Sequence, residues 1–393
     1  MALTAQELQE AVNAKLGKGT VTMASDDKYK TEFVSTGLLP FDILLQGGIP
    51  TGRFTTIYGD YSTLKSYVGL NAIREFQTLG KTCAYIDLEH SFSTEWAESV
   101  GVNVKDLIVE RPATGERAVD IMEVLIRGGI DFIVFDSIAS ALPLSEQDKM
   151  LSEDKIQPGR IADLMSKAMR KLTASNERTA VLFINQTREK IGITFGSNES
   201  LPGGKAVPFY SSYMISARKT GKLTKDIKFY DGDKWASGKE QIGQKYKIEL
   251  VKSKLNKPFR DMWFTWSLTK GQIDLPAFLL AQGVESGLIE VTGNTWVFEN
   301  VRAVGRQKFA DALASDADAL MVLEDRIRMA HGLEARYGLV IAPGSDKAPE
   351  GVKDAPQTTA KRSEEIAKAK RAKASTKLKE PVKKATARRK VAK

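Results

Sequence analysis

Short apolar runs rich in β-branched residues alternate with helix-like segments through the first half of the chain. Five runs have the length and composition of buried strands, at 53–59, 82–88, 107–110, 131–136 and 180–186. Apolar residues recur every three or four positions in the segments expected as helices, at 66–79, 94–100, 116–127 and 160–175. This alternation predicts parallel βαβ units, so the expected fold class is α/β with a doubly wound core.

The pattern changes after residue 204. Runs at 211–219, 226–230, 244–254 and 261–268 are separated by Gly and Asp turns and predict antiparallel strands that extend the same sheet, which would make it mixed. A helix at 276–287, a hairpin at 288–300 and helices through residue 328 predict a small C-terminal α/β lobe. Residues 343–393 contain no aromatic side chain, so we expect a disordered tail there.

Composition narrows the class of protein. The chain has 393 residues, 42% of them hydrophobic, which suits two or three domains with a substantial core. A single cysteine, Cys83, excludes a disulfide framework and any multi-cysteine metal site, and favours a reducing, cytoplasmic compartment. We find no secretory signal and no apolar stretch long enough to cross a bilayer, so we expect a soluble protein without a membrane partner.

The positive charge is concentrated at the C-terminus. The whole chain carries a net +9, but residues 342–393 contain 16 Lys and Arg and only 6 Asp and Glu. The first 341 residues are therefore left at about −1, and the basic character belongs to the tail. The tail would either attract DNA without regard to sequence or merely keep the protein soluble, and the sequence leaves both readings open.

A phosphate-binding loop is predicted directly after the first strand of the core. Residues 59–66 nearly match G-x-x-x-x-G-K-[ST] and lie between a strand and a helix, as such a loop requires. Backbone N–H groups would surround the phosphates, Lys65 would reach the terminal phosphates, and the Ser66 hydroxyl would ligate Mg²⁺. The residues expected around the nucleotide are Gly59, Asp60, Tyr61, Ser62, Thr63, Leu64, Lys65, Ser66 and Tyr67.

Leu64 is the one departure from that pattern. Glycine normally stands at this position because the backbone passes close to the phosphates and leaves no room for a side chain. The leucine puts the phosphate geometry and the turnover in question, but it does not exclude binding.

Two strand-end carboxylates strengthen the prediction. Asp136 ends the apolar run DFIVFD, where a carboxylate would hold Mg²⁺. Glu89 follows the strand of TCAYIDLEH, where it could orient a water for attack on the γ-phosphate. A strand-end salt bridge is the structural alternative for Glu89.

Four stretches, 35–53, 80–92, 183–210 and 251–259, agree in order and spacing with one known family. Over residues 33–328 the chain resembles the RecA-type recombinases, which are DNA strand-exchange ATPases with a RecA-like P-loop core. The resemblance implies four parts: an N-terminal oligomerisation segment (1–33), an ATPase core with the DNA-binding loops (34–270), the C-terminal lobe (271–342) and the tail (343–393). The altered loop and the basic tail indicate a divergent member, for which we hypothesise an origin in a virus of bacteria.

The resemblance also implies catalytic roles. Lys65, Ser66, Glu89 and Asp136 keep the roles above, and Gln186 would sense the γ-phosphate, with a turn-capping amide as the alternative. Trp96 would stack near the adenine unless it packs in the core. Lys252 and Lys254 alternate onto one face of a strand and resemble lysines that reach a neighbouring subunit's ATP; a solvated strand face is the alternative.

Segment 187–206 resembles the family's second DNA-binding loop. Its expected DNA-binding residues are Arg188, Lys190, Ile193, Phe195, Gly203, Gly204 and Lys205, with the glycines supplying flexibility. A mobile loop without a ligand is the alternative. The first DNA loop should lie near 144–157, where acidic residues leave only Lys149, Lys155 and Arg160 as candidate contacts.

These observations predict a DNA-dependent ATPase for homologous recombination. Using ATP and Mg²⁺, the protein would polymerise as a helical filament on single-stranded DNA, pair it with homologous duplex DNA and exchange strands. One alternative is a ring-forming helicase with the same core. Another is an ATP-binding filament protein in which Leu64 suppresses hydrolysis.

Overall fold

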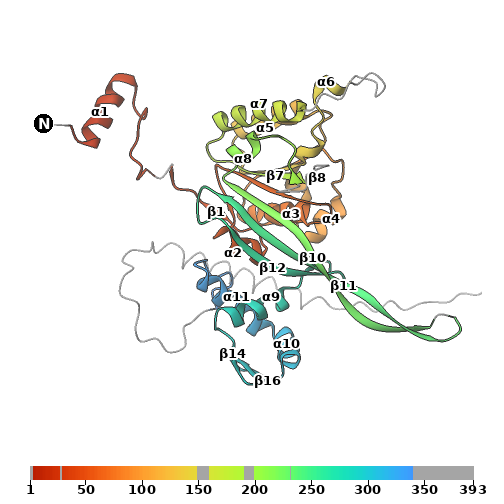
Figure 1. Cartoon of the computed structure of the whole chain (residues 1–393). Coiled ribbons are helices and arrows are strands. Elements are labelled where there is room, and N and C mark those ends of the chain that lie inside the picture. Colours follow the sequence, from red (N-terminus) through yellow and green to blue (C-terminus); the bar gives the residue numbers. More distant parts are fainter. Residues whose placement is uncertain (1–2, 27–28, 148–158, 190–198, 231, 340–393) are drawn as a thin grey trace, which may run out of the picture.

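The computed structural model describes residues 3–26, 29–147, 159–189, 199–230 and 232–339. Figure 1 shows a main α/β body, a smaller lobe beside it, a long hairpin that projects from the body and an N-terminal helix held away from it. The predicted tail, 343–393, lies outside the described residues. Within the described ranges, no helix is long and apolar enough to cross a membrane.

A nine-stranded sheet forms the centre of the body, in the order β13-β12-β11-β10-β3-β7-β6-β4-β5. The five expected core strands are all present and run parallel: β3 (Phe54–Gly59), β4 (Cys83–Asp87), β5 (Leu107–Glu110), β6 (Phe132–Asp136) and β7 (Ala180–Gln186). Strands β3, β4 and β6 are buried throughout, which explains their nearly continuous apolar sequences.

Helices cover both faces of this sheet, as the alternating pattern predicts. Helix α3 (Lys65–Thr78) and helix α4 (Thr94–Val100) place buried residues in one apolar core. Helix α5 (Gly115–Arg127) and helix α7 (Arg160–Ser175) contribute to a second core on the opposite face. Shorter helical turns lie between them: Val104–Asp106, Ile138–Ser140 and α6 (Leu144–Gln147).

The second half of the sheet differs in part from expectation. Strand β10 (Tyr213–Tyr230) is continuous, so the runs at 211–219 and 226–230 are not separate strands. It also pairs parallel to β3, because the connection from β7 passes through helix α8 (Ala206–Tyr210) before the chain re-enters the sheet. The antiparallel strands follow: β11 (Trp235–Ser253), β12 (Arg260–Ser267) and β13 (Gln272–Ile273). The predicted mixed sheet is confirmed.

The projecting hairpin is the outer part of β10 and β11. Pairing of β10 with β3 ends at Ala217, and pairing of β11 with β12 begins at Gly243. We call the segment between them, 218–242, the arm; it extends far from the body in Figure 1. Gly221 resembled a turn in the sequence but lies within the strand, next to a register shift opposite Lys245.

The remaining elements flank the sheet. Strands β1 (Phe33–Val34) and β2 (Ile49–Pro50) form a small pair beside the fully buried helix α2 (Leu39–Leu45), whereas α1 (Ala5–Leu16) has no buried residue. Strands β8 (Arg188–Glu189) and β9 (Glu199–Ser200) also pair. The lobe contains α9 (Leu275–Glu285), β14 (Glu290–Thr292), β15 (Thr295–Phe298), β16 (Val301–Val304), α10 (Arg306–Ser315) and α11 (Ala317–Ala330). Its expected hairpin is a three-stranded sheet.

Candidate nucleotide and DNA-binding site

The predicted phosphate-binding loop connects the end of β3 to the start of α3. Lys65 Nζ donates hydrogen bonds to the carbonyl oxygens of Gly59 (3.1 Å) and Asp60 (2.7 Å) and to Thr63 Oγ1 (3.2 Å). Burial lowers the pKa of Lys65, while the charges of Asp136 and Glu89 act in the opposite direction. The ammonium group therefore lies inside the loop, where a phosphate-binding lysine is needed.

The loop backbone shows why Leu64 is unusual. Leu64 has φ 64° and ψ 14°, and Ser62 has φ 54°, so two residues with side chains occupy the left-handed region. Glycine adopts this region freely, whereas other residues pay roughly 1 kcal/mol. The Leu64 side chain packs against the apolar core, which offsets part of this strain. Besides the space needed by phosphates, the backbone conformation is a second reason for glycine at this position.

Two residues near the root of the arm support the same loop. Tyr246 OH donates a hydrogen bond to the carbonyl oxygen of Ser62 at 2.9 Å, and its ring stacks on Phe264. Lys219 Nζ lies 3.7 Å from the centroid of the exposed Tyr61 ring. No local pattern predicts the Tyr246 contact, because Tyr246 is 184 positions from Ser62.

Asp136 and Ser66 form the candidate magnesium site. Asp136 Oδ2 accepts hydrogen bonds from Ser66 Oγ at 2.7 Å and from Tyr85 OH at 2.5 Å. Its other oxygen, Oδ1, is buried and has no hydrogen-bond partner in the described part of the chain. Burial raises the pKa of Asp136 to about 6. A buried, unpaired carboxylate oxygen beside a hydroxyl fits a hard cation such as Mg²⁺. The sequence does not predict the hydrogen bond from Tyr85, because a tyrosine inside an apolar strand suggests only packing.

Glu89 lies between two neighbouring strand ends. Its Oε1 accepts hydrogen bonds from Ser137 Oγ and from Gln186 Nε2, both at 2.6 Å. These contacts, rather than the alternative salt bridge, occupy the carboxylate among the described residues. The next residue back along β7, Asn185, donates from Nδ2 to the carbonyl oxygen of Pro202 at 2.9 Å. A single strand end therefore contacts both Glu89 and the far end of segment 187–206.

Trp96 lies beside the loop helix rather than in the core. Its side chain is 42% exposed, and its ring centroid is 6.1 Å from that of Tyr67. Tyr67 in turn makes an edge contact with Trp266 at 4.7 Å. The alternative of core packing for Trp96 is therefore not supported, and an exposed aromatic surface is available on this side of α3.

Lys252 and Lys254 reach the same backbone group at the end of α8. Lys252 Nζ donates to the carbonyl oxygens of Pro208, Phe209 (3.1 Å) and Ser211 (2.9 Å). Lys254 Nζ donates to the Phe209 carbonyl oxygen at 2.8 Å. The two side chains share one direction, as their alternation predicted, but their partners lie in α8 or directly after it and not in this protomer's phosphate-binding loop.

Part of the predicted DNA segment is described. Arg188 is exposed on β8, and Lys205 is exposed at the start of α8. Lys190, Ile193 and Phe195 lie outside the described residues, as do Lys149 and Lys155 of the first loop. Arg160 forms an ion pair with Glu146 at 3.3 Å, so it is already engaged by the protein.

The two glycines at the end of this segment are not sources of flexibility, which corrects our expectation. Gly203 has φ 92° and Gly204 has φ 65°, which glycine alone adopts without strain. A Cβ atom on Gly203 would lie 2.8 Å from Val207, and one on Gly204 would lie 2.7 Å from Ala162 Cβ. Both residues hold a tightly packed turn that leads into α8.

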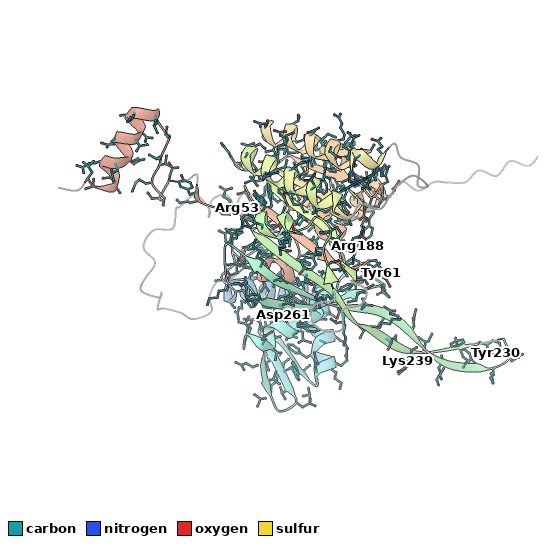
Figure 2. All side chains as sticks on the ribbon, turned by 45° about the horizontal axis from the view of Figure 1, so that its top comes forward. Arg53, Tyr61, Arg188, Tyr230, Lys239 and Asp261 are labelled. Carbon is teal, nitrogen blue, oxygen red and sulfur yellow. The ribbon has the colours of Figure 1, made fainter. Side chains whose placement is uncertain are left out.

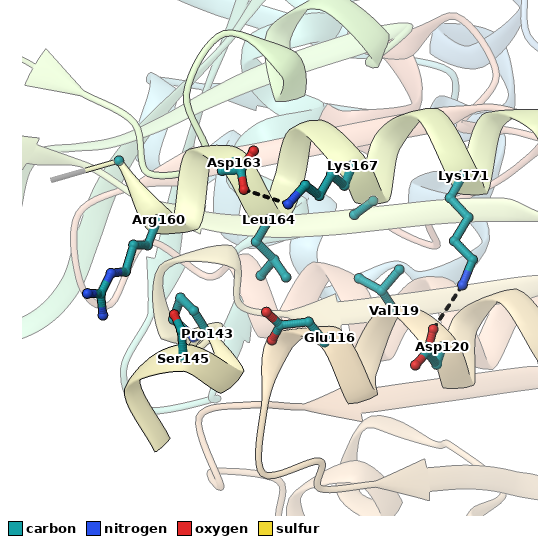
Figure 3. Close-up of a pocket in the computed structure, with 12 residues that line it drawn as sticks. Glu116, Val119, Asp120, Pro143, Ser145, Arg160, Asp163, Leu164, Lys167 and Lys171 are labelled. Atoms are coloured by element: carbon teal, nitrogen blue, oxygen red, sulfur yellow. Dashed lines mark hydrogen bonds and ion pairs between the residues drawn. The ribbon is translucent and has the colours of Figure 1, made fainter. Parts of the chain in front are cut away.

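The cavity of about 610 Å³ between α5 and α7 does not contain the nucleotide residues (Figure 3). Four of its charged side chains form two ion pairs, Lys171 with Asp120 at 2.9 Å and Lys167 with Asp163 at 2.8 Å. The predicted nucleotide residues lie instead where β3, β4, β6 and β7 end. A strand-loop-helix phosphate cradle beside strand-end carboxylates on a parallel sheet defines a P-loop nucleoside triphosphatase.

Comparison with known proteins narrows this class. The family model "RecA N-terminal domain" matches residues 4–272. Protein RecA of Thermus thermophilus is 36% identical over 344 residues, covering 86% of this chain and 96% of that protein. Protein RecA of Bordetella petrii is 33% identical over 347 residues, covering 86% of this chain and 93% of that protein. Protein RecA of Clostridium novyi is 36% identical over 331 residues, covering 83% of this chain and 90% of that protein.

The chain belongs to the RecA family. The predicted RecA-like fold and the predicted activity, a DNA-dependent ATPase that acts in homologous recombination by strand exchange, are confirmed. Neither alternative, the ring-forming helicase nor the filament protein with little hydrolysis, is favoured by any observation.

Proposed function

We propose that this protein binds ATP with Mg²⁺ at the end of β3 and couples its hydrolysis to the binding of single-stranded DNA. The single observation that carries this proposal is the convergence of Lys65, Ser66, Glu89, Asp136 and Gln186 at one edge of the sheet. Backbone N–H groups of residues 59–66 and Lys65 hold the phosphates, and Trp96 with Tyr67 offers an aromatic surface to the base. Bound Mg²⁺ supplies charge neutralisation at the phosphate oxygens.

Asp136 and Ser66 would hold the metal, and Glu89 would orient the attacking water. Glu89 Oε1 is fixed by Ser137 and Gln186, which leaves Oε2 to accept a proton. Gln186 ends the strand that leads directly into segment 187–206, and Asn185 holds the other end of that segment. A change in the Gln186 contact would therefore move the DNA-binding segment when the nucleotide changes.

Lys252 and Lys254 would act in a neighbouring protomer's site. In the single chain they fix the end of α8, and α8 directly follows the DNA segment. Transfer of these ammonium groups from α8 carbonyls to a neighbour's phosphates would make hydrolysis depend on assembly. The partners proposed are single-stranded DNA, homologous duplex DNA and further copies of this chain in a helical filament.

DNA contacts are assigned to the exposed Arg188 and Lys205, with Gly203 and Gly204 shaping the turn beside them. Lys190, Ile193 and Phe195 complete the proposed set. Three points stay predictions: the domain boundaries at residues 33, 270 and 342, the cytoplasmic location, and the origin in a virus of bacteria.

Nucleotide binding by Lys65→Ala tests the site. Because Lys65 is the only lysine or arginine within the loop sequence 59–66, its removal should weaken binding of a fluorescent ATP analogue at least tenfold and abolish ATP-supported filament assembly. Lys254→Ala is the matched control in the protein without DNA, since there it removes an equal charge away from the loop and should keep nucleotide affinity; with DNA it should lose the stimulated hydrolysis. Wild-type affinity in Lys65→Ala would refute the assignment of the loop.

A further inference from the structure

The arm extends beyond what the sheet needs. Strands β10 and β11 contain 18 and 19 residues, whereas strands usually contain five or six. The 218–230 part of β10 would span roughly 40 Å at the usual rise per residue. A two-stranded ribbon of this length is marginally stable by itself, so its side chains must contribute both to its cohesion and to any function.

The two faces of the ribbon differ. Cross-strand pairing places Lys225 opposite Glu240 and Ile227 opposite Gly238 on one face, where the Phe229 ring also lies against Gly238. Cross-strand packing and the opposite charges of Lys225 and Glu240 contribute to the cohesion of the ribbon on this face, where the Phe229 side chain is 44% exposed.

The other face combines cations with exposed aromatic rings, and we call it the aromatic face. It carries Lys228 opposite Ser237, Asp226 opposite Lys239, and Tyr230 opposite Trp235. Trp235 is 72% exposed and Tyr230 is 58% exposed, with their ring centroids 5.9 Å apart in an edge contact. That contact holds the end of the hairpin but leaves most of the Trp235 ring uncovered.

The root of the arm lies near the proposed DNA segment, from which the arm carries the aromatic face outward. Ala217 of β10 pairs with Gly59 of β3, and Gly59 pairs with Gln186 of β7. The arm, the phosphate-binding loop and segment 187–206 therefore leave the sheet at one level of one edge. Neighbouring strands are about 4.8 Å apart, so the arm begins roughly 10 Å from the start of the DNA segment. Figure 2 shows Arg188 and Tyr61 near the root of the arm and Lys239 and Tyr230 along it.

We propose that the aromatic face of the arm binds a single strand of DNA, with Lys228, which lies opposite Ser237, on a phosphate and an unstacked base on Trp235. A lysine that contacts the backbone beside an aromatic ring matches single strands in particular, because every unpaired base presents a face for stacking. This inference rests on the proposed function, in that it adds a second contact region to a protein that already engages DNA.

Salt-dependent binding of the full chain to a labelled oligothymidine, with an ATP analogue present, tests the lysine contact. Lys228→Ala should weaken binding and reduce the slope of log K against log salt by about 0.7, the value for one phosphate on a single strand. Lys225→Ala is the matched control, because it removes the same charge from the opposite face of the same strand. It should leave the slope unchanged. Equal slopes for both variants would overturn the proposal.

Trp235→Ala tests the stacking contact. Affinity for the oligothymidine should fall at least about fivefold, Trp235→Phe should recover most of it, and affinity for a duplex of equal length should change little. Equal losses on single strand and duplex would contradict base stacking. Loss of self-association without a change in binding to a short oligonucleotide would show that the arm contacts another copy instead. If the wild type binds DNA and the arm variants bind it just as well, only the inference about the arm fails. If the wild type binds no DNA, the proposed function fails.

Discussion

At Asp136 the form of the side chain that favours stability differs from the form that the proposed function requires. The carboxyl is buried, one of its oxygens has no hydrogen-bond partner within the described ranges, and its pKa is raised to about 6 by that burial. Ionising such a group in the folded state is unfavourable, yet a cation site requires the ionised form. Its environment is therefore built for a ligand rather than for the stability of the free protein.

Asp136→Asn should make the nucleotide-free protein more stable at neutral pH by roughly 1–3 kcal/mol. The ordinary pKa of this group is 3.8, so below that value it is protonated in both states and carries no penalty. The penalty develops as the pH rises from about 4 through about 6, so the advantage of the variant should be largest above pH 6 and vanish near pH 4. Denaturant unfolding across this range measures it.

The same variant should lose Mg²⁺-dependent nucleotide binding, which separates the two roles of the residue. A variant that is no more stable than the wild type at pH 7, or that gains stability equally at pH 4, would show that burial of the Asp136 carboxylate does not destabilise the protein.

At the scale of elements, the segment between β7 and β10 decides how the DNA region is held. Asn185 fixes Pro202, and Gly203 and Gly204 pass close to Val207 and Ala162 before α8 begins. The C-terminal end of this segment is thus a packed turn at the end of a core strand. Motion of the β7 end can be transmitted through such a turn, because packed contacts shift together rather than deform gradually.

Gly204→Ala should destabilise the protein by about 2–4 kcal/mol, since it adds both left-handed strain and a close contact with Ala162. Gly287→Ala is the control: its φ of 69° is nearly the same, but nothing lies within 4 Å of the added Cβ, so about 1 kcal/mol is expected. Urea unfolding of both variants gives the difference. Equal destabilisation would mean that the turn is loosely packed.

The sequence predicts the regular part of the fold well and the irregular part poorly. The apolar runs predict all five parallel strands of the core, because strands buried on both faces have nearly continuous apolar sequences. The spacing of three and four between apolar residues predicts helices such as α7. The continuity of β10 could not be predicted, since Gly221 has the local character of a turn and only the pairing with β11 carries it into the strand. Tyr85 and Tyr246 were missed because their hydroxyl partners are far away in the sequence.

For the whole molecule, the distribution of charge separates residues 1–341 from the C-terminal residues. Residues 1–341 are nearly neutral, whereas residues 342–393 carry a net +10. DNA affinity of residues 1–341 must then come from local cations that assembly brings together, such as those proposed on the segment after β7 and on the arm. The tail would add an attraction that does not depend on assembly.

Deletion of residues 343–393 should leave the DNA-stimulated ATPase intact but weaken DNA binding at low salt. Each phosphate neutralised by the tail contributes about −0.9 to the slope of log K against log salt on duplex DNA and about −0.7 on single strands. Loss of a few contacts should therefore flatten the slope measurably. Identical affinity and slope in the truncated protein would identify the tail as a solubilising segment only.

In the function proposed here, one edge of the sheet binds the nucleotide, hydrolyses it and responds to DNA. Steady-state ATP hydrolysis with and without single-stranded DNA, compared between the wild type and Glu89→Gln, tests this most directly. The wild type should be stimulated by DNA, and Glu89→Gln should bind ATP and DNA normally but lose turnover, because the amide keeps the shape of the side chain without its basicity. Wild-type turnover in Glu89→Gln would remove Glu89 from its proposed role, and hydrolysis in the wild type that does not respond to DNA would contradict the proposed coupling.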